Sequence, residues 1–238
     1  MENFEAMLAE GAEYFSASLE AGRISKLMRY KELLLEWNAR MNLTAIEEDR
    51  DVIVKHFIDS FSILPFLKNS GESLVDVGTG AGFPGIPVKI ACDATRVLLL
   101  DSLDKRIGFL KTAIGELALE GIDTVHCRAE EAGTDPKYRE SFDISTARAV
   151  ASLPVLLEYC LPLVKPGGIF IAMKGSSTEE LEASKRAMDL LGGGLEEVRE
   201  LTLPFSDIKR NVIVIRKLRQ TPTKYPRKPG KPSKEPLI

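Results

Sequence analysis

Residues 74–85 read LVDVGTGAGFPG, and this stretch decides the fold class of the chain. Its start is apolar and β-branched apart from Asp76, as expected for a buried parallel strand. Glycines then follow at alternate positions, Gly78, Gly80 and Gly82. Because glycine has no side chain and tolerates positive φ, such a turn leaves room for a ligand against bare backbone. Pro84 predicts the first turn of a helix that continues to about residue 90.

The glycine turn is open to three interpretations. Dinucleotide-binding enzymes use G-x-G-x-x-G directly after the strand, but here that pattern begins too late, at Gly80, Gly82 and Gly85. The triplet that follows the strand directly resembles the S-adenosylmethionine (AdoMet) loop of class I methyltransferases. A turn without any ligand is the third interpretation, although three spaced glycines are a costly way to build a plain turn.

The composition is typical of a soluble globular protein. Of the 238 residues, 44% are hydrophobic and 28% are charged, which suits one domain with appendages. No apolar run approaches the roughly 20 residues that span a bilayer. The acidic start, MENFEAMLAEG, lacks the layout of a signal peptide. We therefore expect a cytoplasmic protein with no membrane partner.

Cysteine and histidine are too few and too scattered for a metal centre. The three cysteines, Cys92, Cys127 and Cys160, form no C-x-x-C pair, and the chain has only two histidines. This pattern argues against disulfides and against a zinc site. We therefore expect no bound metal, and three cysteines that act as small apolar residues.

Residues 1–70 are predicted to form a helical extension. Apolar residues recur at helical spacing from Phe4 to Phe15, and Ser25 is a candidate cap for a second helix that carries Trp37. A third helical segment is expected over 49–67. We expect the extension to precede the first strand as a separate part of the chain.

From residue 73 the pattern alternates between strands and helices. The expected strands are 73–77, 96–101, 123–127, 142–146, 168–174, 195–203 and 210–216. The expected helices are 84–91, 103–120, 151–163 and 178–191. This alternation predicts an α/β fold, a doubly wound, Rossmann-like seven-stranded sheet that ends in an antiparallel pair. The core is expected to cover residues 71–218, followed by a tail at 219–238.

The tail differs from the rest of the chain in charge. Residues 219–238 hold six basic side chains and one acidic side chain, whereas the whole chain has a net charge of −3. Five of the thirteen prolines also lie here, so the segment is not expected to fold on its own. A positively charged segment suits a polyanion, and a plain solvated tail is the alternative.

Ligands of an open α/β sheet bind at the carboxyl ends of the strands. Asp101 ends the second strand, where a carboxylate can accept both hydroxyls of a ribose. Helix capping is its alternative role, although Ser102 can cap equally well. Glu130 follows the third strand and can accept an adenine amino group while Ala129 packs on the ring, or it can simply favour a helix N-terminus. Arg148, after the fourth strand, is the candidate active-site residue, with a surface salt bridge as the alternative.

A second motif supports AdoMet binding. The stretch LVKPGGIFIAMKG, residues 163–175, predicts a turn at Pro166–Gly168 before a β-rich strand. Class I methyltransferases commonly carry such a turn before their fifth strand. Two separated motifs in the right order favour AdoMet binding more strongly than either motif alone.

The residues after the fourth strand narrow the chemistry. Methylation of an exocyclic amine commonly uses an N/D-P-P-Y/F/W loop there, whereas this chain has Thr146-Ala147-Arg148-Ala149. Methylation of a pyrimidine at C5 needs a cysteine nucleophile, and neither Cys127 nor Cys160 lies in a motif for it. A ring nitrogen with a free lone pair, such as guanine N7, needs neither a base nor a nucleophile. The sequence is therefore compatible with N7 methylation.

The chain resembles the ribosomal RNA small subunit methyltransferase G family, also called glucose-inhibited division protein B, over nearly its whole length. The segments that carry the resemblance are WNARMNLTAI (37–46), HFIDS (56–60), LVDVGTGAGFPGIP (74–87), LLDSLDKRIGFL (99–110), TARAVASL (146–153) and TKYPRKPGKPSKEPL in the tail. The resemblance implies methyl transfer from AdoMet to N7 of guanine-527 in 16S rRNA, with S-adenosyl-L-homocysteine as the product. It also implies contact with 16S rRNA or the small ribosomal subunit, and we expect a monomer.

The resemblance assigns roles to the candidate residues. The implied cofactor residues are Asp76, Gly78, Gly80, Gly82, Phe83, Asp101, Ser102, Leu103, Ala129, Glu130 and Arg148, and Arg148 is also the candidate catalytic residue. Asn42, His56 and Asp59 lie in family-like segments and are expected near the pocket, although His56 is equally well interpreted as a core or capping histidine. The candidate RNA contacts in the tail are Lys224, Tyr225, Arg227, Lys228 and Lys231.

Other functions stay open on the sequence alone. A methyltransferase of this fold can act on another RNA or on a small molecule, because a fold does not fix the substrate. A nicotinamide-dependent oxidoreductase would use the glycines at 80, 82 and 85. An RNA-binding protein without catalysis would keep the fold and lose the reaction. Titration with AdoMet and with NADH separates the two cofactor classes.

Overall fold

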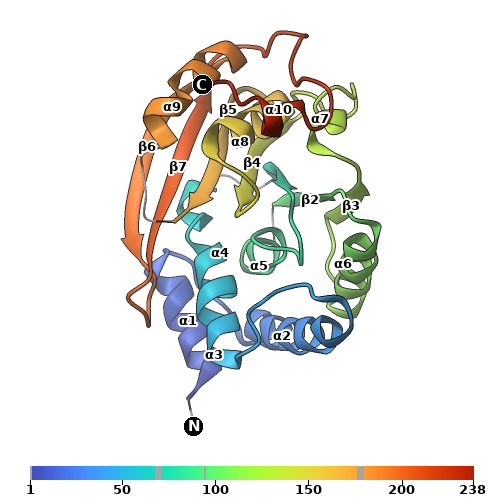
Figure 1. Ribbon diagram of the computed structural model, residues 1–238. Coiled ribbons are helices and arrows are strands. Elements are labelled where there is room, and N and C mark those ends of the chain that lie inside the picture. The colour runs from blue at the N-terminus through green and yellow to red at the C-terminus, as the bar shows by residue number, and fades with distance from the viewer. Residues whose placement is uncertain (1, 68–70, 94, 176–179) are drawn as a thin grey trace.

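The computed structural model describes residues 2–67, 71–93, 95–175 and 180–238, which form one seven-stranded sheet with helices on both faces (Figure 1). The strands are β1 (Ser73–Val77), β2 (Arg96–Asp101), β3 (Ile122–His126), β4 (Phe142–Arg148), β5 (Val164–Lys174), β6 (Gly193–Thr202) and β7 (Lys209–Lys217). Their order is β3-β2-β1-β4-β5-β7-β6. Strands β1 to β5 are parallel, and β7 is antiparallel to β5 and β6. The predicted doubly wound sheet with an antiparallel end is therefore confirmed.

Helices connect the strands and precede the sheet, as predicted. Those between strands are α5 (Gly85–Ala91), α6 (Asp104–Glu116), α7 (Ala129–Ala132), α8 (Leu153–Cys160) and α9 (Glu180–Leu191). The extension contains α1 (Phe4–Tyr14), α2 (Ala21–Met41), α3 (Asp49–Val52), a π-helix (Ile53–Ile58) and α4 (Asp59–Phe61), and 3-10 turns cover Leu64–Phe66 and Leu161–Leu163. The tail holds α10 (Lys231–Lys234). No helix within the described ranges is both long enough and apolar enough to span a membrane.

The sheet separates two hydrophobic cores. Because side chains alternate along a strand, Leu74 packs in a core with α1, α2, α5 and α6, whereas Val75 packs in the core under α7, α8 and α9. Extension residues such as Leu34 and Phe61 belong to the same core as Leu74. The extension therefore covers one face of the sheet and is continuous with the core of the domain.

The order of the strands reverses between β1 and β4, which lie side by side in the sheet. In an open α/β sheet such a reversal leaves a crevice at the carboxyl ends of the strands. The glycine turn follows β1, and residues 149 and 150 follow β4. The two loops meet there, since a Cβ on Gly78 would come within 2.8 Å of Val150 Cγ2.

Two local predictions are wrong. Helix α2 begins at Ala21, so Ser25 lies inside the helix and is not its cap. Strand β5 begins at Val164 and not at residue 168, because the predicted turn is an irregularity within the strand. Gly168 belongs to that irregularity, where a Cβ would lie 2.4 Å from a backbone oxygen of β4. The expected start of a helix at 178–179 lies outside the described residues.

The C-terminal tail packs against the domain. Tyr225 is 6% exposed and belongs to the core under α8. The Arg139 guanidinium donates hydrogen bonds to the backbone oxygens of Thr221, at 2.6 Å, and of Tyr225, at 2.9 Å. In Figure 1, α10 near the end of the tail lies beside α8, which it contacts. A segment that cannot fold on its own is thus ordered by contacts with the sheet domain.

Candidate active site at the carboxyl edge of the sheet

Three cavities lie along the carboxyl edge of the sheet. The glycine-loop cavity, of about 420 Å³, is lined by residues that include Gly78, Thr79, Gly80, Phe83 and Asp101. The Glu130 cavity, of about 210 Å³, is lined by residues that include Ala129, Glu130, Tyr159 and Ser233. The Lys174 cavity, of about 410 Å³, is lined by residues that include Lys55, Asp59, Lys174 and Arg210.

The glycine-loop cavity adjoins both of the others. It shares with the Glu130 cavity the residues Gly78, Ser102 and Val150. It shares with the Lys174 cavity the residues His56, Arg148 and Ala149. The three cavities therefore form one series, with the glycine loop in the middle and Arg148 at one junction.

The glycine loop is held from behind by Asp76. This side chain is fully buried, and its Oδ2 accepts hydrogen bonds from Thr79 Oγ1, at 2.6 Å, and from the Gly85 amide, at 2.9 Å. The Tyr30 hydroxyl of α2 donates to the backbone oxygen of Ala81. Burial raises the pKa of Asp76 to about 6. Asp76 lines none of the three cavities, and in this structure it supports the loop through these hydrogen bonds.

The glycines have different reasons for lacking a side chain. A Cβ on Gly80 (φ +63°) would meet no atom within 4 Å, so this glycine presents open backbone to the cavity. A Cβ on Gly82 would lie 2.6 Å from Ile86 Cδ1, and one on Gly85 would lie 2.3 Å from Leu99 Cδ2. Packing therefore requires glycine at positions 82 and 85. Their presence is explained without a bound dinucleotide.

Asp101 joins the loop to the next helix. Its side chain is buried, and its two oxygens accept from the Gly80 amide and from the Leu103 amide, both at 2.9 Å. Arg106 donates to it at 3.3 Å. The expected cap at Ser102 is wrong, since the N-cap of α6 is Leu103 and no side chain caps it. Leu103 lines none of the three cavities, whereas Asp101 and Ser102 line the glycine-loop cavity.

The third predicted loop lies in the Glu130 cavity. Ala129 and Glu130 open α7 and both line this cavity. Glu130 Oε1 accepts a hydrogen bond from the Gly230 amide of the tail, at 2.8 Å. The carboxylate expected to contact adenine therefore also contacts the C-terminal segment, which the sequence did not predict.

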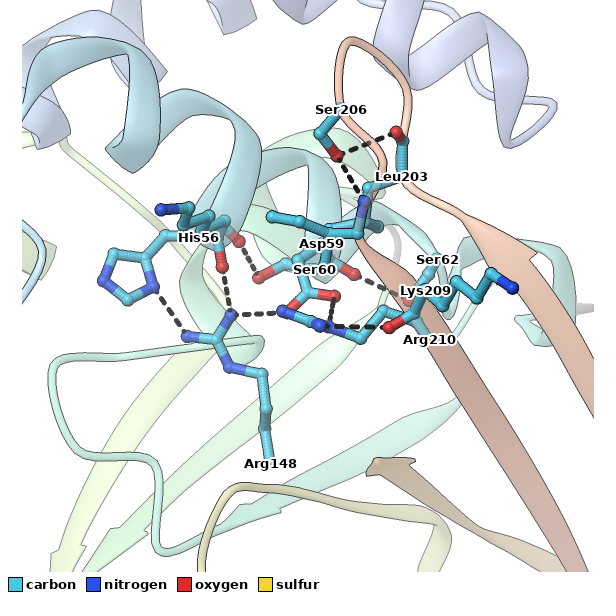
Figure 2. A network of polar contacts seen from close by, with 11 residues as sticks. His56, Asp59, Ser60, Ser62, Arg148, Leu203, Ser206, Lys209 and Arg210 are labelled. Atoms are coloured by element: carbon cyan, nitrogen blue, oxygen red, sulfur yellow. Dashed lines mark hydrogen bonds and ion pairs between the residues drawn. The ribbon is translucent and has the colours of Figure 1, made fainter. Parts of the chain in front are cut away.

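Arg148 is the centre of a buried polar cluster (Figure 2). Its Nη1 donates to the Lys55 backbone oxygen and to Asp59 Oδ2, each at 3.0 Å, and its Nη2 donates to His56 Nδ1 at 3.0 Å. Its guanidinium also lies over the Phe83 ring, 5.2 Å from the centroid. Because the side chain is only 13% exposed, the alternative of a surface salt bridge is wrong.

His56 is neutral and fixed in one orientation. Its ring stacks on Phe83, with 4.4 Å between centroids and 12° between planes. A guanidinium can only donate, so Nδ1 accepts from Arg148 and the proton lies on Nε2, which donates to Thr44 Oγ1 at 2.8 Å. Burial and the neighbouring Arg148 lower the pKa of His56 to about 3. His56 lines both the glycine-loop cavity and the Lys174 cavity, and its burial is equally consistent with the alternative of a core histidine.

The low pKa of His56 predicts an acid-sensitive contribution to stability. Below about pH 6.5 the unfolded chain protonates this histidine, whereas the folded chain keeps it neutral down to about pH 3. The free energy of unfolding of the wild type should therefore fall, relative to His56→Gln, by about 1.4 kcal/mol per pH unit well below 6.5. Urea titrations of both proteins between pH 7 and 5 measure this difference. Parallel curves would contradict the assignment.

Several functional side chains had no sequence signal. Arg210 of β7 donates from Nε to Asp59 Oδ1 at 3.0 Å, so Asp59 binds two arginines. Lys174, at the end of β5, donates to the Ala151 backbone oxygen at 3.0 Å. These basic residues come from strand ends far apart in the sequence, and only the folded sheet brings them to one cavity. Asn42 instead is exposed and ends α2 with φ +50°, a helix-terminating conformation.

The tail residues proposed to bind RNA divide into two groups. Lys224, Lys228 and Lys231 are exposed. Tyr225 is buried, and Arg227 pairs with Glu158 at 2.6 Å. The prediction that Tyr225 and Arg227 contact RNA is therefore not supported, because one side chain is buried and the other is paired with Glu158.

Within the described part of the chain, no cluster of three or more histidine, cysteine, aspartate or glutamate side chains has an arrangement that could hold a metal ion. The three cysteines are free thiols.

Known structures share the fold. A precorrin-6y C5,15-methyltransferase from Geobacter metallireducens matches with a TM-score of 0.51 at 10% identity, over 67% of this chain and 87% of that chain. TrmN from Thermus thermophilus matches with a TM-score of 0.52 at 18% identity, over 70% of this chain and 53% of that chain. At such identities the likeness shows the class I methyltransferase fold alone.

Sequence comparison gives closer relatives. The family described as rRNA small subunit methyltransferase G (GidB) matches residues 23–213. The ribosomal RNA small subunit methyltransferase G of Acetivibrio thermocellus is 64% identical over 97% of this chain and 96% of the relative. The protein of the same name from Alkaliphilus metalliredigens is 52% identical over 97% of this chain and 98% of the relative. The chain therefore belongs to the rRNA small subunit methyltransferase G family.

Proposed function

We propose that this protein transfers a methyl group from AdoMet to N7 of guanine-527 in 16S rRNA, with S-adenosyl-L-homocysteine as the product. Its family supports an rRNA methyltransferase of the small subunit. The structural observation that carries the proposal is the junction between the glycine-loop cavity and the Lys174 cavity, at His56, Arg148 and Ala149. A methyl donor in the first cavity and a base in the second would meet at this junction.

The residues of two adjoining cavities fit AdoMet. The volume of the glycine-loop cavity lies within the range of small-molecule sites, about 300–1,000 Å³. The open backbone at Gly80 leaves room for the methionine part. Asp101 offers a buried carboxylate to the ribose hydroxyls, and Ala129 and Glu130 line the adenine end. Ser102 lies where the two cavities meet.

The polar groups at the junction suit a nucleophile that loses no proton. When bound, AdoMet supplies the methyl group of its sulfonium, and the N7 lone pair forms the new C–N bond as the C–S bond breaks. Arg148 can only donate hydrogen bonds. The accepting nitrogen of His56 is occupied by Arg148, and both oxygens of Asp59 accept from arginines. None of these three groups is placed to remove a proton, and N7 methylation requires no such removal.

The protein therefore contributes to catalysis chiefly by holding the two reactants in position. Arg148 contacts both His56 and Phe83, two stacked rings that line the glycine-loop cavity. Holding two reactants in line contributes on the order of 7–11 kcal/mol to lowering a barrier. A rigid, well-packed junction is what this mode of catalysis needs.

Basic side chains around the Lys174 cavity suit the phosphates of RNA. Lys55, Arg148, Lys174 and Arg210 line it. The two arginines pair with Asp59, whereas Lys55 pairs with Asp51 and Lys174 pairs with Glu180. Exposed tail lysines at 224, 228 and 231 add a second basic surface. Each neutralised phosphate steepens the dependence of log K on log salt by roughly 0.7–0.9. Binding to rRNA should therefore weaken strongly as salt rises.

We infer that the enzyme acts as a monomer in the cytoplasm, where its rRNA substrate is made. We further propose that residues 1–70 support the site through Tyr30 and His56, and that residues 71–218 bind AdoMet. Residues 219–238 would contact RNA and pack against the sheet domain. Light scattering of the purified protein measures the oligomeric state.

Replacing Asp101 by alanine should weaken AdoMet binding. Losing hydrogen bonds to a charged group costs about 1.5–3 kcal/mol, which is roughly ten- to hundredfold in Kd. Calorimetric titration with AdoMet measures the loss. The control is Asp104→Ala, because Asp104 is also an acid near the start of α6 but has a side chain that is 87% exposed.

The same titrations test the proposed function. Wild-type protein should bind AdoMet but not NADH, and it should methylate small subunits isolated from cells that lack the gene. Tight binding of NADH without AdoMet binding would refute the methyltransferase assignment. Equal AdoMet affinity in Asp101→Ala and in the control would remove Asp101 from the cofactor site.

A further inference from the structure

The C-terminal strap, which we define as residues 225–235, forms part of the wall of the Glu130 cavity. Ser233 lines this cavity together with Gly78, Ala129 and Tyr159. The hydroxyls of Ser233 and Tyr159 are hydrogen bonded at 2.7 Å. A segment that lies outside the sheet therefore completes a cavity that opens onto the glycine loop.

A buried ion pair fastens the strap to α8. Glu158, with a side chain only 1% exposed, accepts from the Arg227 backbone amide at 2.8 Å and from its guanidinium at 2.6 Å. The same guanidinium donates to the Glu235 backbone oxygen at 2.8 Å. Arg227 thus holds the start of the strap on the domain and ties its two ends together.

Apolar contacts support this pairing. Tyr225 and Pro232 of the strap are both buried. A Cβ on Gly133, which follows α7, would lie 2.8 Å from Pro226 Cγ, so the strap packs tightly against this end of α7. Such burial is unusual for a basic, proline-rich terminus that serves only as a solvated polyanion-binding tail.

Glu130 connects the strap to the ligand cavity. This carboxylate lines the Glu130 cavity and accepts the Gly230 amide at 2.8 Å through one of its two oxygens, Oε1. The bond can form only while the strap is docked. The position of the Glu130 side chain at the proposed adenine end is therefore coupled to the position of the strap.

We propose that the docked strap completes the adenine end of the AdoMet site, so that the affinity for AdoMet depends on strap docking. This inference rests on the proposed function, because it takes AdoMet as the ligand of the series of cavities. Coupling is reciprocal: a ligand that prefers the docked form stabilises that form by the same factor. A strap that served RNA alone would leave the AdoMet affinity unchanged.

Two variants with the same change in charge test the proposal. Arg227→Ala removes the buried pair with Glu158, whereas Lys234→Ala removes an exposed positive charge from the same strap. By calorimetry, Arg227→Ala should bind AdoMet about tenfold more weakly than the wild type, within the usual range of coupling between sites. Lys234→Ala should bind AdoMet as the wild type does. Thermal unfolding of each variant checks that the domain remains folded.

Hydrogen exchange of the wild-type protein gives a second readout that needs no mutation. The Gly230 amide is protected by Glu130, so saturating AdoMet should slow its exchange by a factor comparable with the affinity change. Wild-type AdoMet affinity in folded Arg227→Ala, or Gly230 exchange unaffected by AdoMet, would overturn the strap proposal and leave the proposed function standing. Failure of the wild type to bind AdoMet would overturn both. AdoMet binding without methylation of rRNA would overturn only the proposed function.

Discussion

Replacing Arg148 by alanine should slow methyl transfer to the small ribosomal subunit by about a hundredfold or more, because a displacement of about 1 Å at a reacting centre already costs this much. Arg148 is the residue that contacts His56, Asp59 and the Phe83 ring at the junction of the two cavities. Its loss frees all three groups to move. Single-turnover rates at saturating AdoMet measure the effect, since saturation removes any change in cofactor affinity.

The loss of rate in Arg148→Ala has to be distinguished from a loss of stability. Without Arg148, the Asp59 carboxylate, 4% exposed, keeps Arg210 as its one ion-pair partner among the described residues, and breaking a buried pair costs about 3–5 kcal/mol. The double variant Arg148→Ala with Asp59→Asn removes both charges and should regain stability without regaining activity. A rate within a fewfold of the wild type in either protein would contradict the assigned role of Arg148.

The second large effect is expected at Gly80. Alanine there adds a methyl group to the open face of the glycine loop, where no protein atom lies within 4 Å. Adding a methyl group to a well-filled site costs about 1–3 kcal/mol, so AdoMet should bind roughly 5- to 150-fold more weakly. Calorimetry gives the Kd, and thermal unfolding gives the accompanying loss of stability.

A second glycine offers a matched control for the backbone cost. Gly167 has φ +88° and, like Gly80, no atom within 4 Å of a Cβ, but it lies in the irregularity of β5 and lines none of the three cavities. Alanine at either position incurs the cost of a left-handed conformation, about 1–2 kcal/mol. Gly167→Ala should therefore lower stability similarly and leave AdoMet binding intact. Equal loss of binding in both variants would mean that Gly80 does not face the cofactor.

Local patterns predicted the sheet because its strands are short and buried. The runs at 73–77 and 96–101 match β1 and β2 residue for residue, since β-branched and apolar residues bounded by polar ones leave little choice of register. The strand ends then placed Asp101, Glu130 and Arg148 at one edge of the sheet. For β5 the prediction was late because the Pro-Gly-Gly sequence resembles a turn, although the strand pairs on both sides of it.

The remaining parts of the site depend on tertiary packing, which periodicity does not describe. Tyr30 belongs to an ordinary amphipathic helix in the sequence, yet its hydroxyl supports the glycine loop at Ala81. Arg210 belongs to an ordinary hairpin strand, β7, which lies between β5 and β6 in the sheet. Its side chain nevertheless donates a hydrogen bond to Asp59 of the extension. Such long-range pairs join the extension to the sheet and leave no signal in a single sequence.

The tail shows how composition can mislead. Its charge and proline content predict a segment that does not fold on its own and suits a polyanion, whereas the structure buries Tyr225 and pairs Arg227 with Glu158. One signal was available in the sequence: Glu158 is the only charged residue of LPVLLEYC, an otherwise almost wholly apolar helix. A lone buried carboxylate requires a cationic partner, and the structure supplies it from the tail.

The proposed activity is tested most directly by mapping N7-methylguanine in 16S rRNA from cells with and without the gene. We expect guanine-527 to be methylated in the parent cells, unmethylated in the deletion strain, and methylated again when the wild-type gene, but not the Arg148→Ala variant, is restored. Methylation of guanine-527 that persists in the deletion strain would show that this protein is not the enzyme responsible.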